Sequence, residues 1–176
     1  LSDFLSPDVV LPVMASRGCH HGACSYCDHA HHVTAMTRRP VERVVADLET
    51  FRQRYGVRHV AFVDDSLPAS VLDGLARQLS EQTAVPGRGL RFSASTRLEP
   101  ALSRDVIERA AASGCHALLL GLESGSQRTL DRMGKGIDLE DATRVLTAVH
   151  DAGVVTWCFF MVGFPGEARA DVAATF

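Results

Sequence analysis

The sequence has no surplus of charge of either sign and no long apolar run. Its 18 Lys and Arg residues nearly balance its 21 Asp and Glu residues, and the net charge is −3. No basic excess therefore indicates nucleic acid as a partner, and no acidic tail indicates disorder. The longest apolar run, 154–164, is too short to span a bilayer, and no secretory signal pattern is present. We expect a cytoplasmic protein whose partners are neither membranes nor nucleic acids.

What the sequence does have is the composition of one globular domain with a sizeable core. Of its 176 residues, 46% are hydrophobic and 22% are charged. The first residue is Leu1 rather than methionine, and Phe176 falls inside a helix that has just begun. We therefore expect the chain to be a piece of a longer protein.

Three of the five cysteines, Cys19, Cys24 and Cys27, fall within nine residues directly after an apolar run. Three thiolates on one loop can hold an iron–sulfur cluster and leave one iron open for another ligand. They can instead hold zinc with a histidine as the fourth ligand, or form one disulfide and leave a spare thiol. The histidines available for a zinc site are His20, His21, His29, His31 and His32.

The rest of the sequence helps to choose among the cluster, the zinc site and the disulfide. An odd cysteine count without a secretory signal disfavours the disulfide. Zinc modules usually pair two ligand couples a dozen or more residues apart, whereas Cys115 and Cys158 stand alone. The spacing therefore favours the cluster, and zinc remains the alternative.

Apolar segments alternate with helical segments along the whole chain. Strands are expected at 9–15, 57–63, 90–96, 115–120 and 154–162, with no clear period at 29–39. Helices are expected after Pro40, around 71–79, after Ser103, at 126–133, after Asp138 and from about Ala168. This alternation predicts βαβ units and a parallel sheet, either covered on both faces or curled into a barrel.

Polar or glycine-rich residues follow each expected strand. The cysteine loop follows the first strand and Asp64-Asp65 the second. Because parallel strands end at one rim, where α/β proteins bind ligands, these residues are expected to surround one site. The other strands end at Ser93, Ser95 and Arg97, at Glu123-Ser124, and at Gly163–Glu167.

At these positions the chain resembles the radical S-adenosylmethionine (SAM) superfamily, in the branch with the methylthiotransferases, the Elongator acetyltransferase subunit and the cobalamin-dependent members. The resemblance covers nearly the whole chain. One departure is that four residues rather than the usual three separate the first two cysteines, as in relatives similar to the cobalamin-dependent group. The motifs are Arg17-Gly18-Cys19, Cys24-Ser25-Tyr26-Cys27, Phe62-Val63-Asp64-Asp65, Gly121-Leu122-Glu123-Ser124-Gly125, Met133-Gly134-Lys135-Gly136 and Gly163-Phe164-Pro165-Gly166-Glu167.

The resemblance implies an α/β fold, a partial (βα)6 TIM-like barrel with parallel strands, of which five strands are visible. Residues 1–176 would form the radical SAM core domain, truncated at its C-terminal end and without an upstream domain. The three cysteines would bind a [4Fe–4S] cluster whose fourth iron takes the amino and carboxylate groups of SAM. The residues expected to contact SAM are Tyr26, Asp64, Asp65, Ser95, Arg97, Glu123, Ser124 and Gly163.

Each of these residue roles has a simpler alternative. Tyr26 could be a core aromatic, and Asp64-Asp65 could cap the next helix. Arg97 could form a surface ion pair with Glu99, and Gly163 could mark a bulge. Glu123 follows a buried apolar run, so an ionised carboxylate there needs a partner, which the resemblance implies is SAM. Cys115 and Cys158 are expected to pack in the core.

The function implied by the resemblance is reductive cleavage of SAM to a 5′-deoxyadenosyl radical, with an electron donor such as flavodoxin or ferredoxin as partner. Cobalamin-dependent methylation is favoured afterwards, with cobalamin held by a domain outside this chain, because Leu5-Ser6-Pro7 and Leu11-Pro12 resemble that group. A methylthiotransferase or a peptide or natural-product maturase without cobalamin is the alternative. From other classes, a structural zinc module and a plain electron carrier remain.

Overall fold

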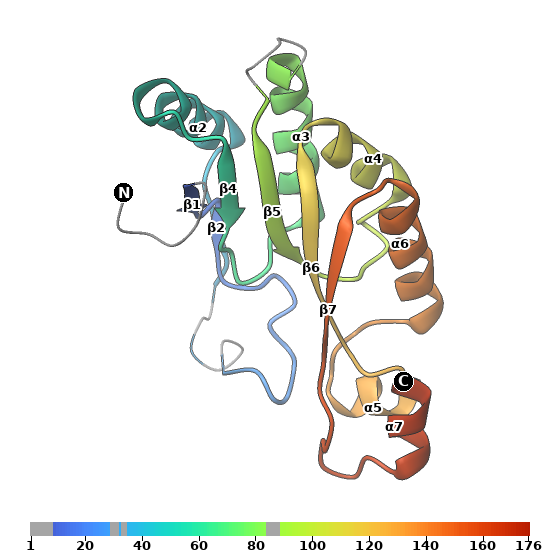
Figure 1. Cartoon of the computed structure of the whole chain (residues 1–176). Helices are drawn as coiled ribbons and strands as arrows, with labels where there is room; N and C mark the ends of the chain where they lie inside the picture. Colours follow the sequence, from blue (N-terminus) through green and yellow to red (C-terminus); the bar gives the residue numbers. More distant parts are fainter. Residues whose placement is uncertain (1–8, 29–31, 33–34, 84–88) are drawn as a thin grey trace.

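The computed structural model describes residues 9–28, 32, 35–83 and 89–176. Its centre is a sheet of five parallel strands in the order β1-β4-β5-β6-β7 (Figure 1). Because this order follows the chain, each strand is joined to its neighbour by a crossover, as successive βαβ units require. The strands are β1 (Val10–Val13), β4 (His59–Phe62), β5 (Arg91–Thr96), β6 (Cys115–Glu123) and β7 (Val155–Phe160).

The crossover helices pack against one face of the sheet, and two shorter helices lie beyond the carboxyl ends of β6 and β7 (Figure 1). None of the helices in the described ranges has the length and apolar character needed to cross a bilayer. The crossover helices are α2 (Val41–Tyr55), α3 (Ala69–Thr83), α4 (Arg104–Ala112) and α6 (Leu139–Asp151), and the shorter ones are α5 (Gln127–Arg132) and α7 (Arg169–Thr175).

Local sequence sets where several of these helices begin and end. The side chains of Ser103, Ser126 and Asp138 accept hydrogen bonds from backbone N–H groups in the first turns of α4, α5 and α6. Gly56 ends α2 in the left-handed conformation that glycine adopts without strain. The expected helix starts after Ser103 and Asp138 are therefore confirmed.

The two faces of the sheet differ in burial because strand side chains alternate between them. On the helix side, residues such as Phe62, Phe92 and Leu118 are almost fully buried in the core. On the other face, Trp157 of β7 is 62% exposed. The sheet is curled but not closed, since β1 and β7 are its two edges and each pairs with one neighbour.

The predicted α/β fold with five parallel strands is confirmed, but β1, β4 and β7 are shorter than predicted and other details differ. Strand β6 runs on to Glu123, beyond the predicted end at 120. The stretch predicted to be loop at 29–39 contains the two-residue strand β3 (Thr37–Arg38), which pairs antiparallel with β2 (Ser16–Arg17).

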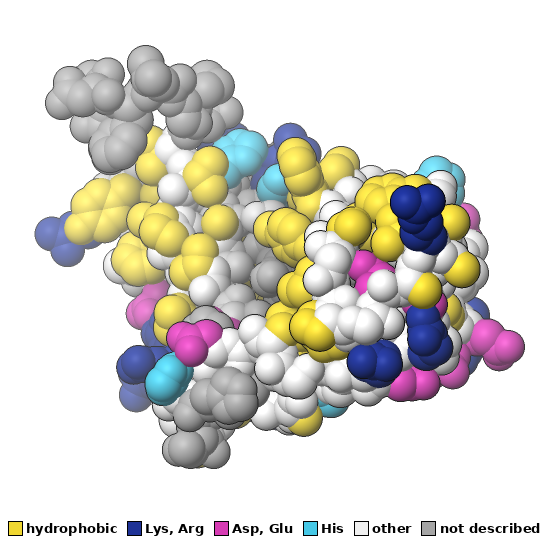
Figure 2. All heavy atoms as spheres, turned by 90° about the horizontal axis from the view of Figure 1, so that it is seen from below, with side chains coloured by type: hydrophobic (Ala, Val, Ile, Leu, Met, Phe, Trp, Pro, Cys, Tyr) yellow, Lys and Arg dark blue, Asp and Glu magenta, His cyan; other side chains and the backbone are white. Residues whose placement is uncertain are grey.

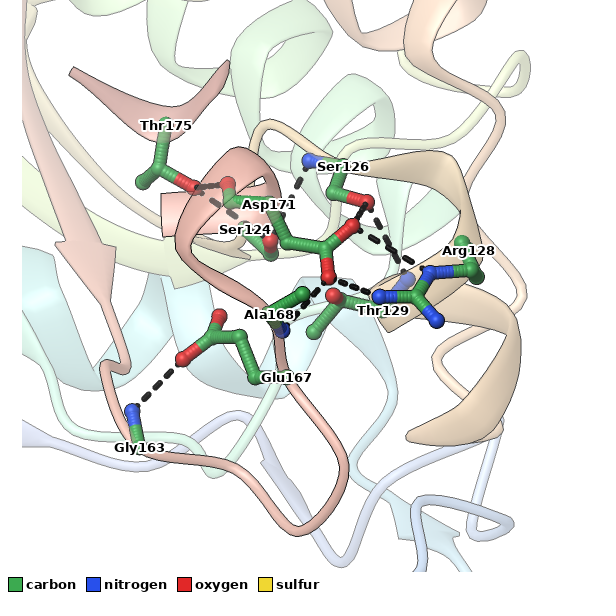
Figure 3. Close-up of polar contacts among 9 residues, drawn as sticks. All are labelled: Ser124, Ser126, Arg128, Thr129, Gly163, Glu167, Ala168, Asp171 and Thr175. Atoms are coloured by element: carbon green, nitrogen blue, oxygen red, sulfur yellow. Dashed lines mark hydrogen bonds and ion pairs between the residues drawn. The ribbon is translucent and has the colours of Figure 1, made fainter. Parts of the chain in front are cut away.

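Asp171 fastens helix α7 to the turn before α5 (Figure 3). Its Oδ1 accepts hydrogen bonds from Ser126 Oγ (2.7 Å) and Arg128 Nε (3.3 Å), and its Oδ2 accepts one from Ala168 N (2.8 Å). Arg128 Nη2 also pairs with Oδ2. The hydrogen bonds from Arg128, Ala168 and Ser126 hold the pKa of Asp171 well below its usual range.

We expect Asp171→Asn to lower the free energy of unfolding at pH 7, because the ion pair with Arg128 is lost. A carboxylate with a depressed pKa stabilises the fold above the pKa of the unfolded chain, about 3.9, and this contribution fades as the pH falls further. The difference between wild type and variant should therefore be constant from pH 7 to 5 and shrink below about pH 4. Urea unfolding at several pH values measures it, with Asp105→Asn in the first turn of α4 as the matched control. Equal stability of wild type and Asp171→Asn at pH 7 would contradict the assignment.

Candidate functional site

A cleft of about 230 Å³ lies at the carboxyl ends of the strands, next to the cysteine loop. Seen from this end, the molecule is hollowed between groups of hydrophobic side chains (Figure 2). A larger hollow of about 420 Å³ between α4 and α6 contains none of the predicted residues. Eight of the eleven predicted site residues line the cleft: Cys19, Cys24, Cys27, Tyr26, Asp65, Ser95, Arg97 and Glu123.

The three loop cysteines are free thiols that face this cleft, with Cys24 buried and the other two half-buried. In the described ranges, no three Cys, His, Asp or Glu side chains converge tightly enough to hold a single metal ion. Thiolates on an iron–sulfur cluster bind separate irons and need not converge on one point. The chemistry and placement of these thiols therefore fit a cluster.

The neighbouring histidines brace the loop. His20 Nε2 donates to Glu99 Oε2 (2.8 Å), and His21 Nε2 donates to the carbonyl of Gly134 (2.7 Å). His32 pairs with Asp28 at 3.1 Å. Each of these three histidines thus has a ring nitrogen on another partner. His29 and His31, the other two zinc-ligand candidates, lie outside the described residues.

The turn after α5 also contacts the cysteine loop. The Ser25 N–H donates to the carbonyl of Met133 (2.8 Å). Gly134 has a positive φ, and a Cβ there would lie 2.9 Å from the carbonyl oxygen of Ala23. Glycine at this position therefore allows the two backbones to approach closely.

The two adjacent aspartates after β4 have different surroundings. Asp64 is buried outside the cleft, and its carboxylate accepts hydrogen bonds from Ala15 N (3.3 Å), Ser16 N and Ser16 Oγ (2.5 Å). Asp65 lines the cleft and accepts a hydrogen bond from Gly18 N (2.9 Å). Asp64 therefore holds the start of the cysteine loop, and Asp65 presents its carboxylate to the cleft.

Glu123 at the end of β6 is paired with Lys135. The Lys135 Nζ lies 3.0 Å from Glu123 Oε1 and 3.0 Å from the hydroxyl of Tyr26, and both charged side chains are largely buried. Glu123 also has a φ of 73°, the one positive φ of a residue other than glycine in the described ranges. At Gly121, a Cβ would lie 2.6 Å from Glu123 Oε1 and 3.0 Å from Lys135 Nζ. The missing side chain at Gly121 is what leaves room for the ion pair.

Lys135 was not among the predicted site residues. It belongs to the motif 133–136 quoted for the resemblance, and a lysine between two glycines gives no periodic pattern that would predict burial. The resemblance implies a ligand as the partner of Glu123, whereas the structure supplies a partner from the chain itself.

Tyr26 lies at the junction of these groups. Burial raises the pKa of its hydroxyl, and the charges of Glu123 and Cys24 raise it further, so the side chain is a neutral phenol. Its ring makes an edge contact with Phe164, with the ring centroids 6.5 Å apart. The residue is half-buried on the wall of the cleft rather than enclosed in the core.

Arg97 is buried, so the ion pair with Glu99 that the alternative predicts is present but does not lie on the surface. Its Nη2 donates to the carbonyl of Lys135 (2.5 Å), and its Nε lies 3.9 Å from Glu99. Ser66 is also buried on the cleft wall, and its hydroxyl has no hydrogen-bond partner in the described part of the chain. An unpaired buried hydroxyl facing a cleft fits a bound polar ligand.

Ser124 and Gly163 do not line the cleft. Ser124 is fully buried against α7, where its Oγ lies 3.3 Å from Thr175 Oγ1 and accepts a hydrogen bond from Ser126 N (Figure 3). Gly163 is exposed, has a φ of 91°, and donates to Glu167 Oε2 (2.6 Å). Their predicted SAM contacts remain predictions.

Comparison with known proteins shows the family. The model of the Radical SAM superfamily matches residues 13–176. The chain belongs to the radical SAM superfamily. Its five-stranded parallel sheet matches the TIM-like barrel of the superfamily and is open between β1 and β7.

The relatives of this radical SAM chain include methyltransferases. This chain is 29% identical over 164 residues to the uncharacterized methyltransferase PH0819 of Pyrococcus horikoshii. The aligned region covers 93% of the chain and 35% of the relative. It shares its fold with the radical SAM methyltransferase TsrM of Kitasatospora setae, solved with tryptophan substrate and a SAM analogue (TM-score 0.81, 21% identity, 94% and 33% covered). A second structural neighbour is the cobalamin-dependent SAM radical enzyme OxsB, solved with aqua-cobalamin (TM-score 0.78, 20% identity, 94% and 25% covered). The chain thus spans between a quarter and just over a third of the length of these three proteins.

Proposed function

We propose that this chain is a radical SAM core that binds a [4Fe–4S] cluster through Cys19, Cys24 and Cys27 and binds SAM in the adjoining cleft. The observation that supports this most directly is that the three thiols share one cleft with buried groups of both charges. A reduced cluster, when bound, would supply the electron that cleaves SAM into methionine and a 5′-deoxyadenosyl radical.

The charged residues of the cleft match the two charges of the methionine end of SAM. Asp65 offers a carboxylate to an ammonium group, and Glu123 has one oxygen on Lys135 and a second oxygen for a ligand. Arg97 and Lys135 offer cations to a carboxylate. The hydroxyls of Ser66 and Ser95 suit the ribose. Lys135 therefore joins the predicted SAM residues, and Asp64 acts by positioning the loop.

We expect Glu123→Gln to weaken SAM binding by about 1.5–3 kcal/mol, the worth of a charged hydrogen bond, which is roughly 10- to 150-fold in affinity. Iron content should be unchanged because Glu123 is not a cluster ligand. Equilibrium dialysis with labelled SAM on the anaerobically reconstituted protein measures the effect. Asp65→Asn tests the second carboxylate, and Glu140→Gln, exposed on α6, is the matched control. If Glu123→Gln and Asp65→Asn both bind SAM as the wild type does, the carboxylates have no role in holding it.

For the reaction that follows, we propose methyl transfer with cobalamin. The support is that relatives and structural neighbours are named as methyltransferases or as cobalamin-dependent enzymes. Residues 1–176 would then be the core domain of a longer protein in which another domain holds cobalamin. A methylthiotransferase or a maturase without cobalamin is the alternative.

Two measurements separate these functions. Anaerobic reduction of the reconstituted chain with SAM should release methionine and 5′-deoxyadenosine, which neither a zinc module nor a plain electron carrier would produce. Titration of the parent protein with cobalamin should then show stoichiometric binding. A parent protein that turns over SAM without binding cobalamin would favour the alternative.

A further inference from the structure

The antiparallel ribbon β2–β3 leads directly into the cysteine loop. Its first strand ends at Arg17, two residues before Cys19, and its second strand is Thr37–Arg38. The Arg39 N–H donates to the carbonyl of Ala15 (2.8 Å), which extends the pairing by one step. The ribbon is therefore a fixed surface beside the proposed cluster site, below β1 (Figure 1).

Three exposed arginines lie on this ribbon. Arg39 pairs with Asp47 and donates to the carbonyl of Met14 (3.2 Å). Arg17 and Arg38 are exposed and have no acidic partner within the described ranges. The only acid between Cys27 and the ribbon is Asp28, which pairs with His32. In a chain of net charge −3, this ribbon is a locally basic surface.

An apolar side chain lies at the centre of the basic group. Met14 is 45% exposed and lines a hollow of about 360 Å³ together with Ser16, Thr37 and the three arginines. Protein interfaces typically have an apolar centre enriched in Met and Arg and surrounded by a polar rim. Charge and shape together therefore mark the ribbon as a docking surface for an acidic protein.

We propose that the β2–β3 ribbon is the docking surface for an acidic one-electron carrier protein that reduces the cluster. This inference rests on the proposed function, because only a reducible cluster requires such a partner. The ribbon brings the partner against the segment that carries Cys19, the ligand nearest to Arg17 along the chain. The charge pattern would steer an acidic partner there and speed association at low ionic strength.

A nucleic acid would also be attracted to arginines, but it fits the rest of the surface less well. Nucleic-acid-binding domains usually carry a basic excess along a whole face, whereas this chain is slightly acidic overall. Binding of RNA to the ribbon in place of a protein would therefore overturn the proposal.

The test uses charge reversal at Arg17→Glu and Arg38→Glu, made separately. Arg58→Glu is the matched control, because Arg58 is exposed just before β4, at the end of the sheet away from the cysteines. Affinity for purified flavodoxin is measured by calorimetry at 20 mM and 300 mM salt. Cluster reduction is followed by stopped flow, once with flavodoxin hydroquinone and once with dithionite, a small reductant that needs no docking surface.

Each ribbon variant is expected to bind flavodoxin at least 10-fold more weakly at 20 mM salt and to be reduced by it at least 10-fold more slowly. The difference should shrink at 300 mM salt because screening weakens exposed charges. Reduction by dithionite and the behaviour of Arg58→Glu should match the wild type. If dithionite reduces no cluster in the wild type, the proposed function fails, and the calorimetry still tests the docking surface. Flavodoxin binding that ignores both reversals, or ribbon-dependent binding of transfer RNA in place of flavodoxin, overturns the proposal.

Discussion

Cys24→Ala protein, reconstituted anaerobically with iron and sulfide, is expected to hold no [4Fe–4S] cluster and to lack the brown colour of the wild type. Cys24 is the buried member of three thiols that face one cleft, so its loss would remove one of the three proposed cluster ligands. Iron and sulfide analysis together with the visible spectrum measure the result. Cys19→Ala and Cys27→Ala should behave in the same way.

The two remaining cysteines provide matched controls for this prediction. Cys115 is buried at the start of β6, and burial raises the pKa of its thiol to about 12. Burial also raises the pKa of Cys158. Because iron binds the thiolate, neither residue is suited as a ligand, and their alanine variants should keep full iron content. Full iron content in Cys24→Ala would overturn the assignment.

Gly114→Ala is expected to destabilise the fold by about 3 kcal/mol or more, near the upper end of the range for single substitutions. Gly114 joins α4 to β6 with a φ of 108°, and a Cβ there would lie 1.9 Å from the carbonyl oxygen of Leu90. Its own carbonyl accepts a hydrogen bond from Phe92 N (3.0 Å), so the backbone cannot shift without disturbing the start of β5. Urea unfolding measures the loss.

Gly153→Ala is the control, because Gly153 joins α6 to β7 in the corresponding way. Its φ is 70°, but no atom lies within 4 Å of the position that a Cβ would take. Only the cost of a left-handed backbone remains, about 1–2 kcal/mol. Equal losses in the two variants would show that backbone strain alone, rather than the contact with Leu90, decides the effect.

Much of the fold could be predicted from the sequence because its elements follow regular patterns. The stripe of α3, Val71 to Leu79, repeats at helical spacing and is buried as expected. Ribbon β2–β3 was missed because two-residue strands have no measurable period. The predicted end of β6 fell short because Gly121 and Glu123 do not look like strand residues, although both pair with β7.

The sequence predicts which edge of the sheet carries the candidate site, but not which side chains face the cleft there. Asp64 and Asp65 are chemically identical neighbours, and only the direction of the chain decides which carboxylate meets the cleft and which meets the backbone of Ser16. Ser124 belongs to the same motif as Glu123, yet it turns toward Thr175. Such differences depend on contacts between distant segments, which a single sequence does not display.

The bracing of the cysteine loop has a consequence for the conformational entropy of the folded chain. Three hydrogen bonds tie the loop region to different parts of the fold. They join Gly18 to Asp65 after β4, His20 to Glu99 after β5, and Ser25 to Met133 after α5. Fixing the backbone of one residue costs roughly 1–2 kcal/mol in conformational entropy, so ordering the nine residues from Cys19 to Cys27 costs on the order of 10 kcal/mol. The hydrogen bonds that distant segments make to this loop offset part of that cost, so the order of the loop depends on the fold around it.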